Sequence, residues 1–226
     1  MDAAYLADAF GQALGLSRKW AAEQQRSESL FAALLDFHSR LRQLKIVELA
    51  AFGIGSDLED VPSLLRARHV RGAENLMSAL RKSSIRFQEH HAAFAEVHAS
   101  MWERHDSAVA AAVDSHGPSS STAAFLAEPT WNVVGAGRGL DAQRILLPPV
   151  AECIEWLAEL DRQYAAELLL KLELLDSIEL GSMSADALHG VAQLWSLQPH
   201  ISLPALERLR VVVASLTLEG SIPRAR

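Results

Sequence analysis

Five of the nine histidines fall in one stretch of the sequence, where they could serve as metal ligands or proton carriers. They are His90, His91, His98, His105 and His116. Metal ligands on one helix stand three or four residues apart, whereas His91, His98 and His105 are separated by seven residues, about 10 Å of helix. The spacing therefore favours histidines that pack between helices over a metal site, and it leaves open a helix contact that responds to pH.

A glycine-rich run, Gly135, Gly137 and Gly139, superficially resembles a dinucleotide-binding loop. Leu140 stands where that pattern needs its last glycine, no strand–helix unit surrounds the run, and the lysine of a phosphate-binding loop is absent. The sequence also lacks the GxSxG and HExxH patterns of hydrolases and metalloproteases. We therefore expect no enzyme activity, no cofactor and no direct small-molecule substrate.

Cys153 is the only cysteine, so neither an intrachain disulfide nor a cysteine-based zinc site can form. Its neighbour Glu152 carries negative charge, which raises the pKa of a thiol. We expect a buried, inert side chain in a reducing compartment.

The composition is that of an ordinary globular protein, with 226 residues, 50% of them hydrophobic and 22% charged. The formal net charge of −7 argues against a protein that coats nucleic acid through bulk electrostatics, but it is compatible with a local basic patch. No stretch approaches 18 uninterrupted apolar residues, and the first residues lack the features of a signal peptide. We expect a soluble intracellular protein with no membrane partner.

Residues 148–180 are the stretch around which we expect the fold to be organised. Pro149 suits the first turn of a helix and Gly181 suits its end. Apolar residues recur at steps of three and four from Val150 to Ile178, so one side of this helix must be covered by at least two others. Its outward positions are mostly acidic.

Similar patterns predict helices elsewhere in the chain. The expected ranges are 17–52 and 62–115 for two further long helices, then 184–197 and 203–219 for two short ones. Residues 2–16 are weakly helical because Gly11 and Gly15 interrupt them, and they either lead into the next helix or form a short one.

The predicted fold is all-α, an elongated antiparallel bundle of three long helices plus two short C-terminal helices. Residues 1–116 would form an N-terminal helical hairpin and residues 148–220 would complete the same bundle. Residues 117–147 show no helix period and are expected to be a flexible loop.

A local basic patch occupies the first half of the second long helix. It consists of Arg66, Arg68, Arg71, Arg81, Lys82 and Arg86, against Glu74 alone. These cations either face the acidic helix of residues 148–180 or contact ribosomal RNA or an acidic partner surface, because phosphate contacts need clustered Arg and Lys but no particular sequence.

Two stretches of the sequence resemble one known protein family. In residues 58–80 the matching residues are Asp60, Val61 and Pro62. In residues 150–178 they are Glu155, Trp156, Leu157, Asp161, Arg162, Tyr164, Leu175 and Ile178. On these residues the sequence resembles the Airim family, ribosome maturation factors that accompany an AAA+ ATPase of the spermatogenesis-associated type. The pieces ELLLK (167–171) and WSLQP (195–199) are more similar to the companion subunit of the same assembly, the cyclin-dependent-kinase-interacting protein.

The resemblance implies a non-catalytic adaptor subunit of an AAA+ ATPase complex that acts in large ribosomal subunit maturation. The implied partners are the ATPase hexamer, a second helical adaptor and a pre-ribosomal particle, and the implied location is cytoplasmic and nuclear. The companion subunit and an unrelated coiled-coil tether stay open as alternatives.

The candidate partner-binding residues come from the basic patch and from the matched stretches. They are Trp156, Tyr164, Lys171, Trp195, Arg66, Arg68 and Arg71. The three aromatic residues serve either as core or as partner anchors, because aromatic anchors dominate the energy of protein interfaces.

Overall fold

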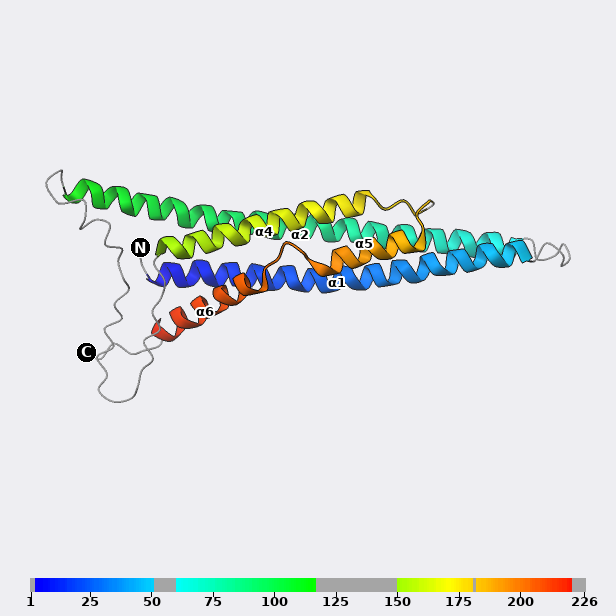
Figure 1. Ribbon diagram of the computed structural model, residues 1–226, viewed down its shortest axis with the longest axis horizontal. Helices are drawn as coiled ribbons and strands as arrows, with labels where there is room; N and C mark the ends of the chain where they lie inside the picture. Colours follow the sequence, from blue (N-terminus) through cyan, green and yellow to red (C-terminus); the bar gives the residue numbers. More distant parts are fainter. Residues whose placement is uncertain (1–2, 51–59, 117–149, 181, 221–226) are drawn as a thin grey trace. The chain divides into compact units, whose positions relative to one another are not determined.

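The computed structural model describes residues 3–50, 60–116, 150–180 and 182–220, and side chains within 5–44, 63–111, 150–180 and 182–216. These residues form helices and turns and contain no strand, which confirms the all-α prediction (Figure 1). The helices are α1 (Ala3–Ala50), α2 (Asp60–His116), α4 (Val150–Asp176), α5 (Ala185–Leu197) and α6 (Leu203–Gly220). The predicted loop 117–147, with its glycine run, lies outside the described residues.

The first helix begins at Ala3, so residues 3–16 continue into the expected helix without a break. Leu6, Phe10 and Ala13 are buried at steps of four and three, and this burial outweighs the helix-propensity cost of the two glycines. The helix α4 ends at Asp176, four residues before the expected end, although Ile178 beyond it is still buried. The helix α5 begins where Ser184 caps it by accepting a hydrogen bond from the Ala187 backbone N–H.

The described chain divides into two compact units, and α1, α2 and α4 contribute to both. The first unit contains residues 1–18, 91–164 and 202–226, and the second contains residues 19–90 and 165–201. The predicted domain boundaries and the predicted elongated bundle of the whole chain stay predictions.

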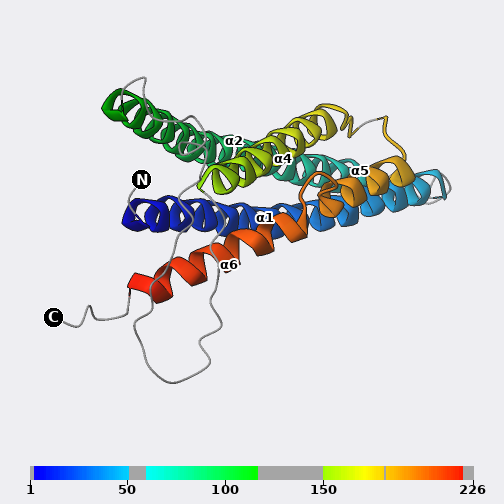
Figure 2. The ribbon, with the colours of Figure 1, turned by 60° about the vertical axis from the view of Figure 1, so that its left-hand side comes forward.

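The second unit has an aromatic core. The Trp20 and Phe87 rings lie 4.5 Å apart between their centroids, and Trp195 packs against both Phe31 (4.9 Å) and Phe87 (6.1 Å). Because Trp20 of α1 meets Phe87 of α2 while Phe37 meets His69, the two helices run antiparallel in this unit. In both views α5 lies along α1 (Figures 1 and 2).

The first unit joins the start of α1, the end of α2, the start of α4, and α6. The Tyr164 ring packs 5.3 Å from the Phe94 ring. The Tyr5 hydroxyl lies 3.0 Å from the Ser100 hydroxyl, and the Arg104 guanidinium lies 3.9 Å from the centre of the Tyr5 ring. The apolar side of α4 is therefore covered by neighbouring helices of its own chain here, since Ile154, Leu157 and Leu160 are buried.

Candidate functional site

A buried ion pair lies at the centre of the second unit. The side chains of Glu167 and Lys171 are both 0% exposed, and Lys171 Nζ lies 3.1 Å from Glu167 Oε1. Lys171 Nζ also donates to the Trp195 carbonyl (3.1 Å) and lies 4.4 Å from the centre of the Trp195 ring. Burial lowers the pKa of Lys171, whereas the neighbouring Glu167 carboxylate opposes this change.

The same cluster links three helices through Trp195. The Trp195 indole N–H donates to Ser27 Oγ (2.8 Å), and Gln24 Nε2 donates to the Trp195 carbonyl (2.8 Å). The backbone N–H of His200 donates to Glu167 (3.3 Å). The cluster therefore fixes α4 and α5 against α1 inside the second unit, and both ionic side chains are closed off from solvent.

The candidate partner-binding residues separate into buried and accessible groups. The buried candidates are Tyr164, Lys171 and Trp195. Of the two roles predicted for the aromatic residues, core residue or partner anchor, Tyr164 and Trp195 are core residues. The burial of Lys171 argues against its direct contact with a partner. Trp156 is half-buried, with the Arg208 guanidinium of α6 5.9 Å from its ring centre, and it is the aromatic candidate that keeps an accessible surface.

An apolar groove runs between α1 and α5 in the second unit, with a volume of about 610 Å³. Its walls include Phe31 and Leu35 of α1 and Ala192 and Leu197 of α5. Leu197 is 72% exposed, and the adjacent Leu194 is 45% exposed. An exposed apolar surface of this kind is typical of a protein-interaction site. This groove was not predicted from the sequence, although Leu194 and Leu197, three residues apart just before Pro199, were a readable signal.

The cations of the basic patch on α2 differ in whether they form ion pairs. Arg86 pairs with Glu23 of α1, Nη1 to Oε1 at 3.2 Å, and Glu23 also accepts a hydrogen bond from Ser83. Among the described side chains, Arg68, Arg71, Arg81 and Lys82 make no ion pair. The expected pairing of these four with the acidic helix α4 is therefore not found within that part of the chain.

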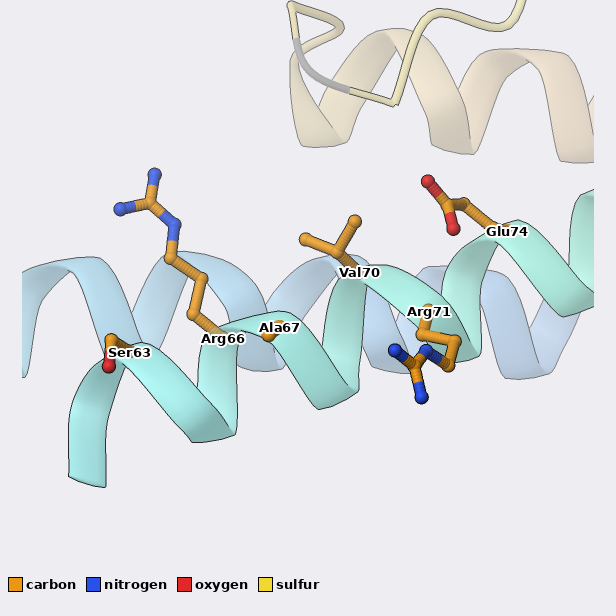
Figure 3. A pocket seen from close by; sticks show the side chains of 6 residues that line it. All are labelled: Ser63, Arg66, Ala67, Val70, Arg71 and Glu74. Carbon is orange, nitrogen blue, oxygen red and sulfur yellow. The ribbon is translucent and has the colours of Figure 1, made fainter. Parts of the chain in front are cut away.

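A shallow hollow follows the first turns of α2 (Figure 3). Figure 3 shows Arg66, Val70 and Glu74 extending from one side of the helix and Arg71 from the other. Glu74 stands three residues after Arg71 and eight after Arg66, and it forms no ion pair with Arg71 among the described side chains. Arg71, together with the exposed Arg68, keeps its positive charge on an open face.

Two of the spaced histidines meet one carboxylate in the first unit. His91 Nε2 lies 3.2 Å from Asp161 Oδ1, and His98 Nδ1 lies 3.3 Å from Asp161 Oδ2. The seven-residue spacing places both rings on the side of α2 that faces α4, as expected for packing histidines. No group of three potential ligands arranged to hold a metal ion occurs among the described residues.

The thiol of Cys153 is buried, as predicted. Desolvation, reinforced by the charge of Glu152, raises the pKa of the Cys153 thiol to about 12. A thiol of this kind is protonated at neutral pH and is a poor nucleophile. None of the described helices has the length and apolar content needed to cross a membrane.

A comparison with protein-family models matches residues 130–218 to the family described as Ribosome biogenesis protein C1orf109-like. The matched range includes α4, α5 and most of α6, and with them the buried ion pair, Trp156 and the α5 side of the groove. No curated protein matches the chain. Through residues 130–218 the chain is similar to the C1orf109-like ribosome biogenesis proteins, which confirms the resemblance predicted from the sequence and supports a role in ribosome biogenesis.

Proposed function

We propose that this chain is a non-catalytic helical adaptor subunit of an AAA+ ATPase complex that acts in large ribosomal subunit maturation. The observation that carries the proposal is the match of residues 130–218 to a ribosome biogenesis family. The adaptor binds the ATPase hexamer and a second helical adaptor, and it meets the pre-ribosomal particle in the nucleus and the cytoplasm.

The α1–α5 groove is the surface that we assign to the ATPase. It lies partly within the matched range, and its exposed Leu197, together with the adjacent Leu194, can be covered by an apolar segment of a partner without any change in the core. The hydrogen bonds that Trp195 makes with Gln24 and Ser27 hold α5 on α1, so the two walls are kept in place before a partner binds.

The proposal is tested by affinity purification of the tagged chain followed by mass spectrometry. We expect an AAA+ ATPase among the recovered partners, and its absence would refute the adaptor role. Leu197→Glu places a charge in the groove and should reduce recovery of the ATPase at least about tenfold. Leu169→Glu is the matched control, because Leu169 is 62% exposed on α4 and does not line the groove.

The companion subunit of the same complex is the second candidate. Its supporting observation is that ELLLK and WSLQP, the two pieces similar to that subunit, meet in one cluster through Lys171 and Trp195. A purification in which the chain brings down a separate C1orf109-like protein would favour this candidate. A coiled-coil tether is tested by light scattering, because its seam residues Phe87, Phe94 and Met101 would have to pair between chains, and a stable monomer would exclude it.

A further inference from the structure

A straight row of exposed side chains follows the outer face of α2. The positions alternate in steps of four and three residues, which places them one above another along a helix. The row, called the outer stripe below, consists of Leu64, Arg68, Arg71, Asn75, Ser78, Lys82 and Ile85, and all seven are exposed. It is about 32 Å long at 1.5 Å per residue, and it contains no acidic residue.

The charge of the outer stripe is unusual for this chain. The whole sequence carries a formal charge of −7, yet the stripe holds three cations, with the exposed Arg81 beside Lys82. Arg68, Arg71 and Lys82 form no ion pair among the described side chains, whereas Arg86, one turn beyond Lys82, is already held by Glu23. Glu74, the nearest acid, stands three residues after Arg71, but the two side chains form no ion pair in the described part of the chain.

From this geometry we propose that the outer stripe binds the phosphate backbone of RNA. Arg and Lys side chains supply the charge, and the amide of Asn75 and the hydroxyl of Ser78, between the two groups of cations, supply further hydrogen-bond donors for phosphate oxygens. A sequence-independent contact of this kind suits a chain with a role in ribosome biogenesis.

An acidic amphipathic helix is the other anionic partner to consider, and the stripe fits it less well. Such a helix needs a continuous apolar seam, but the aliphatic members of the stripe, Leu64 and Ile85, stand at its two ends. The middle of the stripe is polar throughout. The proposal goes beyond the adaptor function and does not depend on the ATPase, so either can fail without the other.

The test is fluorescence anisotropy of a labelled 15-nucleotide single-stranded RNA of mixed sequence with the full chain. Three phosphate contacts predict a salt slope of about −2, so the Kd should rise about 20-fold between 50 and 200 mM salt. The double variant Arg68→Gln with Arg71→Gln keeps one phosphate contact, so its Kd should rise only about threefold over the same salt range. Binding at 50 mM salt should weaken at least about tenfold in this double variant.

The control variant is Arg162→Gln with Arg210→Gln, which removes the same charge from exposed arginines that pair with Glu159 and Glu207. Its RNA affinity should stay within about twofold of the wild type. An equal loss in the control, or a Kd insensitive to salt, would overturn the proposal. Displacement of the RNA by a 15-residue polyglutamate peptide at equal concentration would overturn it in favour of an acidic protein partner.

Discussion

The Lys171→Met substitution leaves Glu167 as a buried carboxylate without its cation. Both side chains are 0% exposed, so solvent does not screen the lost interaction. Methionine matches the volume of the lysine stem, and the Trp195 carbonyl keeps its hydrogen bond from Gln24, so the loss is mainly electrostatic. Removal of one partner from such a pair costs about 3–5 kcal/mol, and we expect the free energy of unfolding to fall by that amount.

A double variant separates the charge effect from packing. Glu167→Gln together with Lys171→Met removes both charges and keeps a side-chain acceptor for the His200 N–H. We expect the double variant to recover most of the stability lost by Lys171→Met alone, because paired removal of a buried ion pair is often nearly neutral. The coupling between the two substitutions should exceed about 2 kcal/mol.

The measurement is urea unfolding followed by far-ultraviolet circular dichroism at constant pH. Arg40→Met is the matched control, because Arg40 pairs with Asp36 four residues away at 2.8 Å, and both side chains are more than half exposed. That substitution should cost less than about 1 kcal/mol. If Lys171→Met costs no more than Arg40→Met, or if the two core substitutions are additive, the reasoning about the buried pair is wrong.

Three further predictions concern two helix glycines, the buried Cys153 and the partly buried His90. Gly15→Ala should raise the free energy of unfolding by about 0.5–1 kcal/mol, because a Cβ at this position meets nothing within 4 Å. Gly72→Ala should not show this gain, because its Cβ would lie 2.5 Å from the Phe37 ring. Urea unfolding measures both variants. The Cys153 thiol should resist a disulfide reagent at pH 8 in the native protein and react fully in urea, and rapid native reaction would contradict its burial. Desolvation lowers the pKa of His90, so the folded state binds fewer protons than the unfolded state just below pH 6.5. The free energy of unfolding therefore falls as the pH falls through that window. His90→Gln should flatten this part of the curve of stability against pH, and an unchanged curve would refute the assignment.

The sequence predicted the helices well because apolar periodicity is a local signal. It left the start of α1 open, because the intrinsic cost of Gly15 is visible in the sequence but the burial of Phe10 that offsets it depends on other helices. The spacing of His91 and His98 correctly indicated packing histidines.

Contacts between helices were harder to predict, because they depend on register. Asp161 reads as an outward acid of α4, yet it meets two histidines of α2. Arg86 was predicted to contact either the acidic helix or a partner, whereas it pairs with the carboxylate of Glu23, 63 residues earlier in the sequence. Lys171 was interpreted as a partner contact, although a glutamate four residues before it, inside an apolar stretch, is the local pattern of a buried pair.

The proposed adaptor role is tested most directly by native mass spectrometry of the purified chain mixed with an AAA+ ATPase of the spermatogenesis-associated type and a second helical adaptor. The account predicts an assembly heavier than the ATPase hexamer by whole multiples of 24.6 kDa plus the mass of the second adaptor, and loss of the 24.6 kDa increments with Leu197→Glu but not with Leu169→Glu. Spectra that show only free chain and unmodified hexamer at micromolar concentrations would contradict it.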